Sequence, residues 1–359
     1  MRLTTEAQRN TGKALAADPL KEIGPLCRSV PLWLALLCAL VCLPATAAAQ
    51  NTHLAVIVGL AGEPEHGELF RRWAATLVDH ASARLGLPRE RIIYLLEKPE
   101  QDAKRATGRS SKEEIDKALT ALASSAGADD VVFIVLIGHG TFDGKVAKFN
   151  LPGPDMTAAD FAADLKRFGS RKVVFVNTAS ASGPFVEALA GPGRTVVTAT
   201  RTGAERFSTL FGGYFVDALA SDTADADKNR RVSVLEAFNV AKVEVERAYE
   251  KQGIMITEHA LLEDGGDGEG SMDPSAEGKD GRVAAILSLG TPTAALALPE
   301  DPKLRQLYED RRELERRVEA LKLLKTGMDP GKYVSELEKL VTELALKTRE
   351  IRAFEGKKQ

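Results

Sequence analysis

Between residues 52 and 289 the chain alternates short apolar runs with longer amphipathic stretches, and this alternation restricts its fold more than any other feature. The apolar runs predict six strands, at residues 54–59, 92–96, 131–137, 172–176, 195–200 and 283–289. Three of them are almost wholly apolar, which is typical of parallel strands buried on both faces. The sequence therefore predicts an α/β fold with a mostly parallel sheet.

The amphipathic stretches between these runs predict the helices that cover the sheet. They span residues 68–85, 112–124, 158–168, 183–189, 208–220 and 233–251. Ser111 with Glu114 three residues later is a capping signature at the start of the second helix. We expect this α/β domain to occupy residues 50–290.

The first 49 residues have the pattern of a secretory signal. A basic segment ends at Arg28, an apolar run covers residues 30–43, and small residues precede Ala49. The apolar run is too short for a comfortable membrane span. We expect cleavage after Ala49 and a periplasmic or secreted protein, which would be attached to a membrane only if the signal stayed uncleaved.

The cysteines limit the chemistry of the exported chain. Cys27, Cys38 and Cys42 are the only cysteines, and all precede the predicted cleavage point. The mature chain would then have no disulfide, no thiolate metal ligand and no cysteine nucleophile. Removing the leader's five basic and three acidic residues changes the formal charge from −3 to −5. With no sustained basic stripe, nucleic acid is not an expected partner.

The end of the chain has a different composition. A Pro/Ala-rich linker at residues 291–302 leads into apolar residues at heptad-like spacing: Leu307, Leu314, Val318, Leu321, Leu337, Val341, Leu344 and Ile351. Asp329 and Pro330 at the break predict a new helix start. We expect an α-helical hairpin over residues 303–355. The two helices can pack on each other or on the domain, or form a coiled coil that joins copies into a homo-oligomer.

Two predicted strands end in polar turns. His139 stands between Gly138 and Gly140 after one strand, and the turn Thr178-Ala179-Ser180-Ala181-Ser182-Gly183 follows the next strand along the chain. The carboxyl ends of parallel strands meet at one edge of the sheet, where ligands usually bind. Glycines let a backbone N–H approach a ligand closely, and small residues opening a helix leave backbone donors free for an anion.

In this layout the chain resembles the caspase-like cysteine peptidases of clan CD, in particular the legumain-like branch. The resemblance covers residues 53–289 and implies a caspase-like three-layer α/β/α sandwich. It also implies that His139 is the catalytic-type histidine, that the Gly140 N–H is an oxyanion donor, and that Ser180 stands in the place of the nucleophilic cysteine. Arg201 and Glu205 fall where the family builds its specificity pocket, although the two could equally form an internal ion pair.

Serine in place of cysteine changes what the site can do. A thiol beside an imidazole is a ready nucleophile, whereas a serine hydroxyl needs a closely hydrogen-bonded, oriented base. The favoured hypothesis is therefore a pseudoenzyme that binds a peptide or protein segment in the former active site. The alternative is an active hydrolase that uses Ser180, or Ser182, with His139 as base.

One further motif indicates a cation. Oxygen-bearing side chains occupy positions 1, 3, 5, 9 and 12 of a twelve-residue segment, which is the EF-hand spacing: Asp225, Asp227, Asn229, Ser233 and Glu236. Arg230 stands at position 6, where glycine is usual. The segment fits a calcium site in a calcium-stabilised structural module, with the ion not required for the fold. It fits equally well an acidic cap on the helix starting near Ser233.

Overall fold

The computed structural model describes residues 50–290 and 301–355. The predicted signal sequence, and all of the predicted linker except its last two residues, lie outside the described residues. Within the described ranges no helix is both long and apolar enough to cross a membrane.

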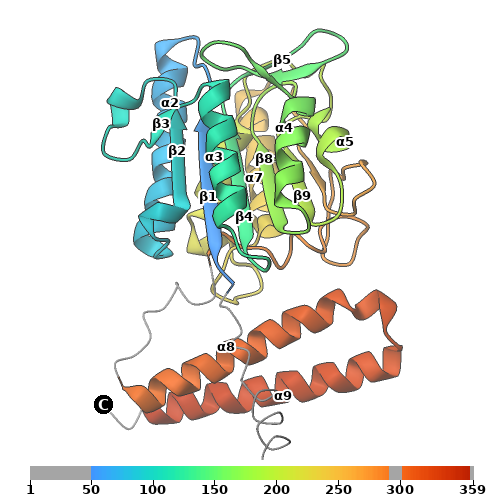
Figure 1. The fold of residues 1–359 in the computed structure, drawn as a ribbon. Coiled ribbons are helices and arrows are strands. Elements are labelled where there is room, and N and C mark those ends of the chain that lie inside the picture. Colours follow the sequence, from blue (N-terminus) through green and yellow to red (C-terminus); the bar gives the residue numbers. More distant parts are fainter. Residues whose placement is uncertain (1–49, 291–300, 356–359) are drawn as a thin grey trace, which may run out of the picture. The chain divides into compact units, whose positions relative to one another are not determined.

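A seven-stranded sheet forms the centre of the domain, in the spatial order β10-β9-β8-β4-β1-β2-β3 (Figure 1). Its strands are β1 (Thr52–Val58), β2 (Ile92–Leu96), β3 (Gly108–Arg109), β4 (Val131–Ile137), β8 (Lys172–Asn177), β9 (Arg194–Thr198) and β10 (Leu261–Glu263). All neighbouring pairs are parallel except β9 and β10. A small antiparallel sheet of β5 (Gly140–Phe142), β6 (Ala147–Phe149) and β7 (Met156–Thr157) follows β4.

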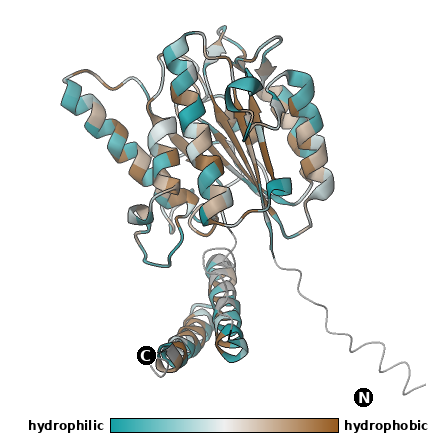
Figure 2. Ribbon diagram, turned by 90° about the vertical axis from the view of Figure 1, so that its left-hand side faces the viewer, coloured by the Kyte–Doolittle hydropathy of each residue, from teal (hydrophilic) through white to brown (hydrophobic). Residues whose placement is uncertain are grey.

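Helices cover both faces of the central sheet, and Figure 2 shows the apolar strands between them. One layer contains α2 (Pro64–Asp79), α6 (Phe211–Leu219) and α7 (Val234–Gln252), and the other contains α3 (Lys112–Ser125), α4 (Ala158–Leu165) and α5 (Phe185–Leu189). Alternate residues of β4 point to opposite faces of the sheet, each of which has its own hydrophobic core. Phe133 and Val135 pack against the first layer, and Ile134 and Leu136 pack against the second. The predicted three-layer α/β/α sandwich is confirmed.

One predicted strand is wrong. Residues 283–286 form turns, in which Ala285 donates a backbone hydrogen bond to the residue four positions earlier, and Ser288 makes only an isolated antiparallel bridge with Ser233. The edge of the sheet is instead the short strand β10, which pairs antiparallel with β9. A short apolar run has the same composition in a buried turn as in a buried strand, so its pattern does not separate them.

The predicted helical hairpin is present as α8 (Pro302–Leu323) and α9 (Pro330–Glu355). The Asp329 carboxylate accepts the Lys332 N–H at 2.9 Å, as expected of the helix cap. Leu314, Val318 and Leu321 pack in one apolar cluster with Leu340. The two helices therefore bury their apolar stripes against each other, whereas Val341 is exposed.

Candidate functional site

His139 follows β4 at the carboxyl edge of the sheet, where α2 begins. Its ring makes edge contacts with two aromatic side chains of that helix, with centroid distances of 4.7 Å to His66 and 5.1 Å to Phe70. His66 and Phe70 are four residues apart and so lie on one helix face. The imidazole is thus held by α2 as well as by its own turn.

The environment of His139 favours the neutral ring. Burial lowers the pKa of His139, and the neighbouring His66 ring lowers it further, while a hydrogen bond with the Ala61 backbone and the charge of Glu63 oppose the shift. A neutral imidazole can accept a proton, as a general base must. Among the described residues, however, no carboxylate is hydrogen-bonded to the ring to orient it.

Ser180 lies three residues beyond β8 and is only 3% exposed. Its hydroxyl donates to the Gly140 carbonyl at 3.1 Å and accepts the Gly140 N–H at 3.3 Å. In the part of the chain that the structure describes, no hydrogen bond joins Ser180 to His139. The serine is therefore bonded to the backbone of the histidine turn and not to its imidazole.

The two turns touch through their backbones. A Cβ atom added at Gly140 would lie 2.3 Å from the Ser180 carbonyl oxygen, which explains why position 140 carries glycine. Ala181 adopts a φ of 54°, a conformation uncommon for a residue with a side chain, and donates its N–H to the Glu205 carbonyl at 2.7 Å. The Ser180 turn is thus fixed on both sides of the serine.

Ser182, the second serine of the turn, is buried in a different network. Its hydroxyl lies 3.1 Å from that of Thr200 and accepts the Thr200 N–H at 3.2 Å. The Thr200 hydroxyl also accepts the Gly183 N–H at 3.1 Å. These bonds tie the turn to the residues that follow β9 and involve the buried Ser182 hydroxyl.

Glu205 and Arg201 have separate environments. The Glu205 carboxylate accepts the N–H groups of Arg201 and His259, each at 3.0 Å, and pairs with His259 Nδ1 at 3.0 Å. The Arg201 guanidinium instead lies 3.8 Å from the Met272 sulfur and is exposed. Glu205 joins two loops, while Arg201 keeps its charge free toward solvent.

The calcium-type loop brings three of its five predicted ligands together. Carboxylate oxygens of Asp225, Asp227 and Glu236 all lie within 4.8 Å of one another. Arg230 adopts the positive φ of 68° that glycine usually supplies at this position. Burial raises the pKa of Asp227, with the charge of Glu236 as a further cause. A cation among these carboxylates would relieve that repulsion.

The remaining two predicted ligands are held by local bonds. Ser233 and Glu236 form a capping box at the start of α7, with the Ser233 hydroxyl donating to Glu236 Oε2 at 2.8 Å. The Asn229 side chain donates to Asp227 at 2.8 Å. Ser233 and Glu236 therefore cap α7, as the helix-cap hypothesis predicts. Glu236 also belongs to the carboxylate cluster with Asp225 and Asp227.

Sequence reasoning missed two residues at this site. His66 contacts His139, and Ser208 places its hydroxyl 3.3 Å from His66 Nε2. His66 lies two residues before the helix predicted at 68–85, whereas α2 begins at Pro64, so its i, i+4 spacing to Phe70 gave a signal only for a helix that starts earlier. Ser208 precedes α6 and carried no such signal. We define the His139 site as His139, Gly140, Ser180, His66 and Ser208.

The segment that carries the His139 site is similar to a known protein family. Residues 108–262 match the model of the Peptidase C13 family, a segment that contains His139, Ser180 and the calcium-type loop. Among solved structures, protein GSU0716 from Geobacter sulfurreducens is similar, with 12% identity, a TM-score of 0.40, and coverage of 69% of this chain and 100% of that one. No curated protein matches. The family match confirms the resemblance to the legumain-like branch of the caspase-like peptidases.

Proposed function

Because residues 108–262 match the Peptidase C13 family, we propose that the protein is an exported, catalytically inactive relative of these peptidases. It acts in the periplasm or outside the cell and binds a peptide or protein segment at the His139 site. The signal sequence directs export. The helical hairpin serves as a spacer or docking arm, and its exposed apolar residues offer a contact between copies.

The observation that carries the proposal is the bonding of Ser180. A serine becomes nucleophilic when a base removes its proton during attack, and the base must be hydrogen-bonded to the hydroxyl. Here the Ser180 hydroxyl lies 3.1 Å from the Gly140 carbonyl oxygen, to which it donates. The Gly140 N–H, which the family resemblance makes the oxyanion donor, is directed at the same hydroxyl. The Ser180 hydroxyl is thus bonded to Gly140 and not to His139, and this bonding supports the proposal of an inactive site.

The side chains exposed at the His139 site support the proposal that it binds a peptide or protein segment. His66 and His139 are half-buried aromatic side chains with polar atoms, and Ser208 beside them is exposed. Leu60, near the start of the first βα turn, is 38% exposed, and Phe207, next to Ser208 in the chain, is 69% exposed. Exposed apolar groups next to a few fixed polar groups are typical of recognition surfaces.

The proposal is tested by peptide hydrolysis with purified protein. Using a mixed fluorogenic peptide library, we expect the wild type, Ser180→Ala and His139→Ala to release fluorophore at the same background rate. A working serine–histidine pair loses about a thousandfold or more in rate when either member is removed. Hydrolysis by the wild type that both substitutions abolish would establish the active hydrolase instead.

A calcium-stabilised module is the second candidate, and the converging carboxylates of Asp225, Asp227 and Glu236 favour it. A calcium site in this loop does not conflict with a binding role at the His139 site. The loop lies directly before α7, and its first residue, Asp225, is buried. A bound cation would neutralise three nearby negative charges and fix the loop against the domain.

Calcium is expected to raise the melting temperature. About 5 mM Ca²⁺ acting on a weak extracellular-type site should stabilise the domain by about 1–2 kcal/mol, or about 2–8 °C. Asp227→Asn should remove the rise, and Asp273→Asn, at an exposed aspartate outside the loop, should keep it. Differential scanning calorimetry measures the melting temperatures with and without Ca²⁺. A wild-type melting temperature that does not change when calcium is added would rule out this site.

A further inference from the structure

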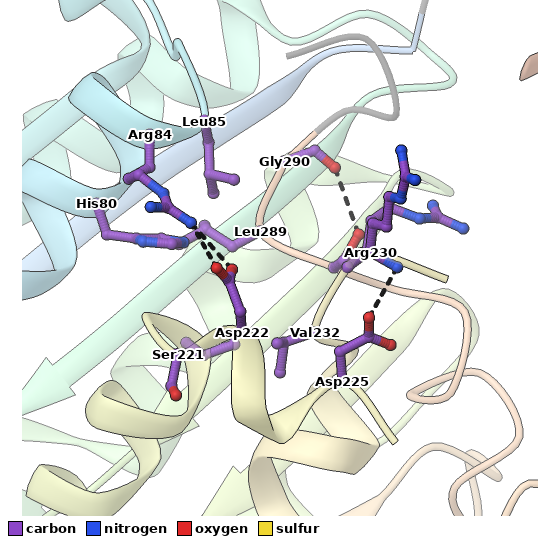
Figure 3. A pocket seen from close by; sticks show the side chains of 13 residues that line it. His80, Arg84, Leu85, Ser221, Asp222, Asp225, Arg230, Val232, Leu289 and Gly290 are labelled. Carbon is purple, nitrogen blue, oxygen red and sulfur yellow. Dashed lines mark hydrogen bonds and ion pairs between the residues drawn. The ribbon is translucent and has the colours of Figure 1, made fainter. Parts of the chain in front are cut away.

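A hollow with a volume of about 380 Å³ opens beside the calcium-type loop. Its wall comes from four segments: the end of the α2 region, which is α2 with residues 80–85 that follow it, the turn after α6, the loop itself, and the last described residues of the domain (Figure 3). A volume of this size is in the range of small-molecule pockets, about 300–1,000 Å³. The hollow is thus large enough to take an organic ligand.

This hollow is separate from the His139 site. Both His66 and His80 belong to the α2 region, but His66 touches His139 whereas His80 lines the hollow. Fourteen residues of helix at 1.5 Å each place the two histidines about 20 Å apart. Since α2 runs antiparallel to its neighbouring strands, the hollow lies at the amino edge of the sheet.

The hollow is lined by three arginines and two aspartates, an excess of one positive group, and one of the aspartates, Asp225, belongs to the carboxylate cluster of the calcium-type loop. Arg84 forms an ion pair with Asp222, in which its Nη2 donates to both carboxylate oxygens, at 3.0 and 2.8 Å. The Asp225 carboxylate is held by backbone N–H groups, among them that of Arg230 at 2.8 Å. Within residues 50–290 and 301–355 neither Arg230 nor Arg231 has an ion-pair partner, and Arg231 is half-buried. Two guanidinium groups therefore remain to bind an anion.

The rest of the wall is apolar. Leu219 and Leu289 are buried, and Leu85 and Val232 are half-buried around the same hollow. Burial lowers the pKa of His80, and Arg84 lowers it further, so the ring adds no charge at neutral pH. An apolar wall with guanidinium groups from one side is complementary to a ligand with one anionic end.

We propose that this hollow binds a carboxylate attached to an apolar body, with Arg230 and Arg231 on the carboxylate and the leucines around the body. Guanidinium groups form strong, geometrically matched hydrogen bonds with carboxylates. The apolar body gains by leaving water. A free medium-chain carboxylate and a peptide ending in leucine both have this chemistry.

Isothermal titration calorimetry with octanoate tests the proposal on the purified exported chain. We expect the wild type to bind octanoate with a Kd of about 1 mM or tighter, and octanol and acetate at least about tenfold more weakly. Octanol lacks the charge and acetate lacks the body. Arg231→Ala should weaken octanoate binding about tenfold, and Arg230→Ala should weaken it less because that side chain is more exposed.

Arg247→Ala is the matched control, because Arg247 is a paired surface arginine of α7, outside the hollow. It should leave octanoate binding unchanged. A Leu-terminated peptide is measured as the free acid and as the amide, which lacks the carboxylate. If the peptide acid binds more tightly than octanoate, the ligand is a peptide C-terminus. If octanoate binds more tightly, the ligand is a free medium-chain carboxylate. No octanoate binding to the wild type, or equal binding by Arg231→Ala and Arg247→Ala, would overturn the proposal.

Discussion

Ser208→Trp is expected to weaken peptide binding at least about a hundredfold, whereas Ser180→Ala is expected to leave it unchanged. Ser208 is exposed and its hydroxyl lies 3.3 Å from His66 Nε2. His66 in turn contacts His139. An indole at this position would crowd the His66 imidazole and the proposed binding surface beside it, and loss of a central contact region costs several kcal/mol. Removing the Ser180 hydroxyl removes bonds only within the protein.

Peptides for this experiment come from selection of a random peptide library against the immobilised wild type. Affinities for the wild type, Ser208→Trp and Ser180→Ala are then measured by fluorescence anisotropy. Ser124→Trp is the matched control, since Ser124 is exposed on α3 in the other helix layer. Peptides that bind Ser208→Trp as well as they bind Ser124→Trp would show that recognition occurs elsewhere.

Gly183→Ala is expected to destabilise the domain by at least about 2 kcal/mol. A Cβ atom at position 183 would lie 2.2 Å from the Arg201 carbonyl oxygen and 2.5 Å from the Thr202 nitrogen. These are backbone atoms, so the contact is relieved only by moving the loop that follows β9. That movement would also strain the bonds between Ser182 and Thr200.

Gly67→Ala provides the comparison in the same protein. Gly67 lies inside α2, and its added Cβ would meet nothing closer than 3.5 Å. Alanine is favoured over glycine in a helix by about 1 kcal/mol, so this variant should be slightly more stable than the wild type. Urea unfolding measures both. Equal stability of Gly183→Ala and the wild type would mean that the turn packs less closely than described.

Much of the domain was predictable because its apolar runs are long. The strand predicted at 131–137 and the helix predicted at 112–124 differ from β4 and α3 by at most one residue. Residues 283–289 were misassigned because a buried turn and a buried strand share the same apolar composition. The short strand β10 was missed because three residues give no periodicity to detect.

The candidate site was predictable by position but not by bonding. The ends of two strands placed His139 and Ser180 at one edge of the sheet, as observed. The hydrogen bonds between Ser180 and Gly140 depend on the close approach of two backbones, which no spacing in the sequence encodes. The same holds for Glu205, whose partner His259 is 54 residues away along the chain.

Ser180 is bonded to the Gly140 backbone, and we propose that His139 does not activate it. Labelling with a fluorophosphonate probe, followed by peptide mass mapping, measures whether the Ser180 hydroxyl is nucleophilic. Folded wild-type protein is expected to carry no label on Ser180, with or without calcium. A label on Ser180 that appears in the wild type and disappears in His139→Ala would contradict the claim and identify an active serine hydrolase.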